Sequence, residues 1–258
     1  MLRVIPYRTT SHVVVWLTET GRRITTIVKG AARPRSPFLG QYDLGYTCEL
    51  LYYDRETGGI HHIRECMPLV PRAYLRTNWA AMACASYFCH LANLTTPIDV
   101  LVPEAHALLT VSLDSLDSAQ NPELVLWYEM ALLHHLGLAP RVERCLGCGR
   151  RDTPNAERNV FSVARGGVLC AACKRAPGHD HAGTLPMDPA VLDFLQHAAA
   201  LPPPHSGRRL SLIEEFQTSR ILGMFLQYHV DLPPECRDTV LRLLRFSAGQ
   251  AVAAHGLS

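Results

Sequence analysis

The chain has 258 residues, 48% of them hydrophobic, and carries a formal net charge of +2. A chain of this length and composition can form one large domain or two smaller domains with real cores. Its longest apolar stretch, residues 79–92, is interrupted by Ser86 and His90 and is shorter than the roughly 20 residues that span a bilayer, so no membrane role is indicated.

The basic part of the chain is its N-terminal part. Residues 1–76 carry eleven Lys and Arg against six Asp and Glu, whereas residues 77–258 carry fourteen against seventeen. Short β-rich runs alternate with turn signals in this basic part, and we expect five strands over 2–7, 12–17, 22–29, 46–53 and 60–66. Alternation in the fourth run gives it two faces, one of them core, with Tyr46, Cys48, Leu50 and Tyr52 together on one side. Five such strands form a small barrel or sandwich.

A basic loop is expected between the third and fourth strands, in the sequence KGAARPRS at residues 29–36. Glycine and proline make this loop irregular, and two arginines precede it on the third strand. A flexible basic loop beside a barrel rimmed by Phe38, Tyr42 and Tyr46 could hold the backbone of single-stranded nucleic acid and stack its bases. The alternative is a solvated loop with those aromatic residues in the core. The candidate DNA-binding residues are Arg22, Arg23, Lys29, Arg33 and Arg35.

From Pro71 onward the hydrophobic period becomes helical. Helices are expected over 72–93, after Pro103, from Asn121 to near Gly137, over 210–230 and over 235–246. In the third of these, the predicted apolar stripe extends to His135. In the helix over 210–230, the predicted buried stripe is Ile221, Met224, Phe225 and Tyr228.

Two Cys-x-x-Cys hooks, Cys145-Leu-Gly-Cys148 and Cys170-Ala-Ala-Cys173, are separated by 21 residues. Two such hooks supply the four thiolates of a closed, tetrahedral, structural Zn²⁺ site, whereas a catalytic site keeps one position open. We therefore expect one structural zinc ion per chain. The alternatives are two reducible disulfides or a redox pair, and His179 or His181 replacing a cysteine ligand.

The remaining cysteines have no partner spacing and are predicted to be small core residues: Cys48, Cys66, Cys84, Cys89 and Cys236. An odd total of nine, with no secretory start at the N-terminus, favours the cytoplasm. The sequence has no phosphate-binding loop, no His-Glu-x-x-His and no Gly-x-Ser-x-Gly, so we expect no enzyme. A zinc-ribbon transcriptional regulator is the main alternative to a protein that binds single-stranded nucleic acid, and a nucleic-acid-modifying enzyme is a weaker one.

Five segments in order give the chain a family resemblance: VKGAARPRS, WYEMALLHHLGLAP, CLGCG, FSVARGGVLCAAC and SRILGMFLQYHV. Together they resemble the RecO family of bacterial recombination mediators. The resemblance implies an α+β protein, with an N-terminal OB-fold β-barrel over 1–76 and an all-α domain over 77–258 that bears a four-cysteine zinc module at about 141–176. Ala32 stands where many relatives have another basic residue.

The resemblance also implies a function. Such proteins bind single- and double-stranded DNA, anneal complementary strands, and work with RecR to help RecA load onto DNA coated by single-stranded DNA-binding protein. They contact the C-terminal tail of that coating protein. The expected location is the cytoplasm, at the nucleoid.

Overall fold

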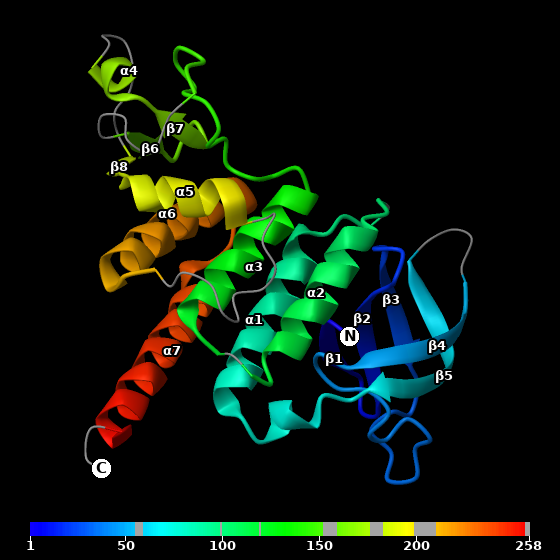
Figure 1. The fold of residues 1–258 in the computed structure, drawn as a ribbon. Helices are drawn as coiled ribbons and strands as arrows, with labels where there is room; N and C mark the ends of the chain where they lie inside the picture. The colour runs from blue at the N-terminus through cyan, green and yellow to red at the C-terminus, as the bar shows by residue number, and fades with distance from the viewer. Residues whose placement is uncertain are drawn as a thin grey trace. The chain divides into compact units, whose positions relative to one another are not determined.

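The structure, a computed structural model, describes residues 1–54, 59–98, 100–118, 120–151, 159–175, 183–198 and 210–255 (Figure 1). It separates into two compact units, Met1–Gln120 and Asn121–Ser258. The first helices after the sheet therefore belong to the first unit by compactness, whereas the periodicity of the sequence changes at Pro71. Because compactness and periodicity are different criteria, the predicted domains 1–76 and 77–258 stay a prediction.

The first unit is built on a five-stranded sheet. Its strands are β1 (Arg3–Tyr7), β2 (Ser11–Leu17), β3 (Arg23–Val28), β4 (Thr47–Tyr53) and β5 (Ile60–Val70). They are ordered β1-β2-β3-β5-β4, and the β3–β5 pair is parallel while the others are antiparallel. This strand order, with β5 placed between β3 and β4, is that of the five-stranded, partly open OB-fold barrel. The predicted fold of the N-terminal part is confirmed.

The barrel core lies on one face of these strands. Val14, Trp16, Ile24 and Val28 form its centre, and the Trp16 indole nitrogen donates a hydrogen bond of 2.9 Å to the Thr26 hydroxyl. The other face carries the residues at the alternate positions. Alternation predicted that one face of β4 belongs to the core, and the face with Cys48, Leu50 and Tyr52 packs there.

Three helical segments complete the first unit: the 3₁₀ turn η1 (Ala73–Arg76) and the helices α1 (Trp79–Thr95) and α2 (Pro103–Ser115). The expected helix start at residue 72 is wrong. Arg72 has a left-handed backbone, and the Asn78 side chain accepts hydrogen bonds from the amides of Ala80 and Ala81, which makes Asn78 the N-cap. The helix after Pro103 is confirmed.

The longer helices in the described part of the second unit are α3 (Pro122–His135), α5 (Pro189–His197), α6 (Leu212–Val230) and α7 (Pro234–His255). The α3 helix begins at the predicted cap, where Asn121 accepts from the Leu124 amide. It is buried on all sides over most of its length rather than along a stripe, and His135 is exposed. Tyr228 of α6 is also exposed, so both stripe predictions were wrong at their ends.

A small sheet in the second unit carries the cysteine hooks. Its strands β6 (Val160–Ser162), β7 (Gly167–Leu169) and β8 (Thr184–Pro186) are ordered β7-β6-β8, and the short helix α4 (Ala171–Arg175) follows β7. β8 lies beyond residue 176, where the predicted zinc module ends, and the bounds of this module stay a prediction. None of the helices in the described ranges is long and apolar enough to cross a membrane.

Candidate metal centre and basic surface

The four hook cysteines meet at one point. The sulfur atoms of Cys145, Cys148, Cys170 and Cys173 all lie within 4.8 Å of one another, and the Cys148 and Cys170 sulfurs are 3.8 Å apart. A tetrahedron with Zn–S bonds of about 2.3 Å has edges of about 3.8 Å. The donor set and its spacing therefore fit a closed Zn²⁺ site.

The first hook is shaped by two glycines. The amide of Gly149, which has a φ of 72°, donates to the Cys145 carbonyl at 2.9 Å and closes the turn. A Cβ atom on Gly147 would lie 2.7 Å from the Cys173 sulfur, so only glycine fits there without displacement. The Leu146 amide donates to the Val168 carbonyl at 2.8 Å, which ties this hook to the end of β7, where the second hook begins.

The thiols differ in how readily they ionise. Burial raises the pKa of Cys145, but hydrogen bonds from backbone amides outweigh it and lower the pKa to about 6. The amides of Gly147 and Cys170 donate to this sulfur at 3.4 and 3.3 Å. Hydrogen bonds with the other three cysteines raise the pKa of Cys173 to about 12. Four thiolates this close repel one another, so full ionisation requires a cation at their centre.

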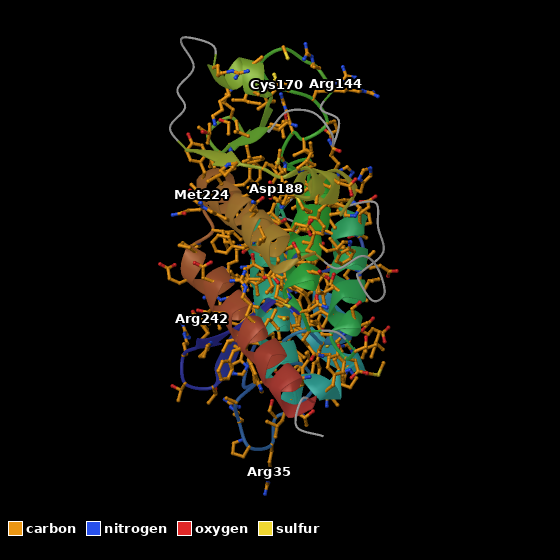
Figure 2. All side chains as sticks on the ribbon, turned by 60° about the vertical axis from the view of Figure 1, so that its left-hand side comes forward. Arg35, Arg144, Cys170, Asp188, Met224 and Arg242 are labelled. Carbon is orange, nitrogen blue, oxygen red and sulfur yellow. The ribbon has the colours of Figure 1, made fainter. Side chains whose placement is uncertain are left out.

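The basic residues Arg144 and Lys174 lie beside the cysteine hooks in the sequence. Both side chains are exposed, and the donors to the Cys145 sulfur are backbone amides. Arg144 and Cys170 lie at the same end of the second unit (Figure 2). The alternative ligands His179 and His181 lie outside the described residues.

All nine cysteines are described, and all are free thiols. Two hooks that converge on one point are not explained by a single redox pair. Among the other five, Cys84 and Cys89 are buried as predicted, but Cys236 is exposed, so the core prediction for it was wrong. Cys48 and Cys66, which have no pattern in the sequence, lie on adjacent strands, and both thiols donate to the Gln41 carbonyl at 3.6 Å.

Two polar side chains attach the cysteine module to the helices of its own unit. The Gln196 amide nitrogen of α5 donates to the Val142 carbonyl at 2.7 Å, and the His229 ring of α6 donates to the Val163 carbonyl at 2.7 Å. Neither contact has a sequence signal, because both join residues more than fifty positions apart.

The basic loop is a series of hydrogen-bonded turns. The Arg33 amide donates to the Gly30 carbonyl at 3.1 Å and the Ser36 amide to the Arg33 carbonyl at 3.0 Å. The Ala32 amide donates to the Thr10 carbonyl at 3.0 Å, which fastens the loop to the turn between β1 and β2. The buried side chain of Ala31 joins the barrel core.

The five candidate DNA-binding residues form two groups. Lys29, Arg33 and Arg35 are exposed on the loop that follows β3, and Arg35 points away from the barrel at the tip of this loop (Figure 2). Arg22 and Arg23 are half-buried at the opposite end of β3, about 20 Å away along a strand of six residues. The Arg23 guanidinium donates to the Asn93 carbonyl near the end of α1, so this arginine fastens the helix to the barrel.

The aromatic rim expected beside the loop belongs largely to the core. Tyr46 is 5% exposed. Tyr42 packs edge-on against Trp16 with ring centres 5.9 Å apart and shares a hydrogen bond of 2.8 Å with His12. Phe38 is partly buried against the same core. For these residues the interpretation as core aromatics is the correct one.

The comparisons with known proteins agree with the resemblance noted in the sequence. A family model described as Recombination protein O C terminal matches residues 76–237. The chain is 26% identical over 235 residues to DNA repair protein RecO of Exiguobacterium sibiricum, covering 88% of this chain and 91% of that protein. It is 30% identical over 244 residues to DNA repair protein RecO of Anaeromyxobacter sp. strain K, covering 89% of both chains, and 28% identical over 249 residues to that of Roseiflexus sp. strain RS-1, covering 94% and 84%.

Proposed function

Because the chain belongs to the RecO family, whose role is in DNA repair and recombination, we propose that it is a non-enzymatic recombination mediator. It binds single- and double-stranded DNA, anneals complementary strands, and helps RecA load onto DNA coated by single-stranded DNA-binding protein. Its protein partners are RecR and the C-terminal tail of the coating protein, and it acts in the cytoplasm, at the nucleoid. These details follow from the family.

The observation that carries the DNA-binding proposal is the group of exposed cations on the hydrogen-bonded loop after β3: Lys29, Arg33 and Arg35. Annealing is slowed by repulsion between two phosphate backbones. A fixed group of cations lowers this repulsion by displacing counterions, and no chemical step is needed. Arg22 and Arg23 stay predicted contacts, at a separate place on the same barrel.

The zinc proposal depends on the four converging thiols. Cys145, Cys148, Cys170 and Cys173 would hold one structural Zn²⁺, whose charge would offset their mutual repulsion. Elemental analysis of the purified chain should give one zinc per chain, and Cys145→Ser should lose both the metal and thermal stability. Folded wild-type protein without zinc would refute this assignment.

The test of the main proposal is annealing of complementary fluorescent oligonucleotides across a salt series, with and without the cognate coating protein. The wild-type chain should accelerate annealing without cleaving a strand. Replacing Lys29, Arg33 and Arg35 with alanine should slow annealing and reduce the dependence of log K on log salt for single strands by about 2, because each lost phosphate contact contributes about 0.7.

The matched control removes the same charge from the cysteine module, by replacing the exposed Arg144, Arg150 and Arg151 with alanine. This variant should retain the wild-type salt dependence. An equal loss in both triple variants would mean that net charge, and not the basic loop, governs binding. An unchanged salt dependence in the loop variant would place the DNA surface elsewhere. Tight binding to one duplex sequence without annealing would instead favour the zinc-ribbon regulator.

A further inference from the structure

An exposed tyrosine lies in the same row of the sheet as the first cation of the basic loop. The register pairs Tyr7 with Ser11, and pairs His12 with Val28. The antiparallel register therefore brings Ser11 opposite Lys29, one position beyond the end of β3. Two strand spacings place the backbones of Tyr7 and Lys29 about 10 Å apart.

The side chains in this row belong to the face of the sheet that does not form the core. His12 and Val28 occupy the core side, where Val28 is fully buried, so their neighbours Ser11 and Lys29 point to the opposite side. Val4 packs on the core, and Tyr7, three positions later on β1, alternates to the same outer side as Lys29.

The Tyr7 ring is both accessible and positioned. The residue is 41% exposed, and the guanidinium carbon of Arg8 lies 5.3 Å from the ring centre. Arg8 has a φ of 53°, a left-handed conformation that is uncommon for arginine. The backbone strain at this turn accompanies a cation held against an aromatic ring, which is a favourable contact.

The basic loop is joined to this turn. Besides the hydrogen bond from Ala32 to Thr10, the Gly30 amide lies within 3.5 Å of the Ser11 hydroxyl. The exposed ring therefore has Arg8 against it on its own turn, and shares a row of the sheet with Lys29 on the adjoining loop. OB-folds bind oligonucleotides on the face of strands 2 and 3 and on the loop between strands 1 and 2, which here is the turn after Tyr7.

From this arrangement we propose that Tyr7 is a stacking subsite for one base of single-stranded DNA, with Arg8 and Lys29 contacting the flanking phosphates. This inference rests on the proposed DNA binding and adds that the site distinguishes single-stranded from double-stranded DNA. A base in a single strand offers a free face to an aromatic ring, whereas a base inside a duplex is already stacked on both sides. Tyr7 should thus contribute to the binding of single strands and not to that of duplexes.

The experiment measures fluorescence anisotropy of a labelled oligothymidine and of a mixed-sequence duplex, for the full chain at several salt concentrations. Tyr7→Ala should weaken single-strand binding about 5-fold or more at every salt concentration. The salt dependence should stay that of the wild type, because no cation is lost. Duplex binding should not change. Tyr7→Phe should bind single strands like the wild type, since it keeps the ring.

Two further variants separate the loss of base stacking from a general loss of aromatic surface or of folding. Trp79→Ala removes a 53% exposed aromatic ring from the same unit and should leave binding unchanged. Tyr7→Leu keeps apolar volume but has no π-face, so it should weaken single-strand binding as much as Tyr7→Ala does. This variant tests the stacking role even if Tyr7→Ala folds poorly. Single-strand binding by Tyr7→Leu at wild-type strength would overturn the proposal, as would an equal loss on the duplex.

Failure of this inference is distinct from failure of the proposed function. A wild-type chain that binds no oligonucleotide, or that keeps its affinity when Lys29, Arg33 and Arg35 are replaced, refutes the basic loop as the DNA site, and the subsite falls with it. A wild-type chain that binds through the loop while Tyr7 variants bind equally well refutes the subsite alone.

Discussion

The ion pair between Glu129 of α3 and Arg237 of α7 should be the most sensitive point in the second unit. The guanidinium donates two hydrogen bonds to the carboxylate, at 2.7 and 2.9 Å, and a third to the Ser219 hydroxyl at 3.3 Å. The side chain of Glu129 is 0% exposed and that of Arg237 is 3% exposed. Removing one partner of such a pair leaves an uncompensated buried charge and costs about 3–5 kcal/mol.

Both single variants should be destabilised. Arg237→Met removes the two hydrogen bonds that the guanidinium donates to the buried carboxylate, and Glu129→Leu removes the carboxylate that pairs with a buried guanidinium, which stays charged. The double variant Glu129→Leu/Arg237→Met should lie within about 1 kcal/mol of the wild type, because apolar replacements of buried pairs are often neutral.

Urea unfolding followed by circular dichroism measures these differences, and the single variants should also lower the melting temperature by about 10 °C. The control is Arg245→Met, which breaks the pair of Arg245, 42% exposed, with Glu215 and should cost less than about 1 kcal/mol. Equal losses in Arg237→Met and Arg245→Met, or a double variant as unstable as the singles, would refute this reasoning.

Three other predictions concern local features. Gly147→Ala should lower zinc content in elemental analysis, because the added Cβ would approach a ligand sulfur to 2.7 Å, and full occupancy would contradict the fit. At pH 8, iodoacetamide should label Cys236 before Cys84 and Cys89, whose pKa values burial raises to about 12 and about 11; peptide mass mapping that finds equal rates would contradict their burial. Asn78→Ala should lower the free energy of unfolding by about 1 kcal/mol in urea titrations, and an unchanged midpoint would mean that α1 does not need this cap.

Local patterns predicted the parts of the fold that depend on neighbouring residues. The alternating runs predicted the five strands, and Asn121 followed by proline predicted the start of α3, because capping and alternation act over a few positions. The hook spacing predicted that four thiols would meet. Each hook holds two thiols close together, so the fold only has to bring the two hooks together.

The errors came from tertiary contacts. The sequence around Tyr46 reads as a barrel rim, but the residue is buried and forms hydrogen bonds with Met1 and Arg76, both distant in the chain. Arg23 reads as a surface cation, yet it bonds to Asn93, seventy positions later. Glu129 is an acidic residue within an apolar helix, and it pairs with Arg237 on α7, more than a hundred positions later. The periodicity of one segment does not predict these pairings, because the partners lie in distant segments.

The strand β8 sets limits on how the cysteine module can be removed. It pairs with β6 through Val160, Phe161 and Ser162, although it follows both hooks in the chain. A deletion that ends after the last cysteine would therefore leave an orphan edge strand with unsatisfied amides and an apolar side chain, Leu185, in water. A deletion that removes the metal site should therefore also remove β8 through Pro186, so that the chain continues directly into α5. No unpaired strand is then left at the surface.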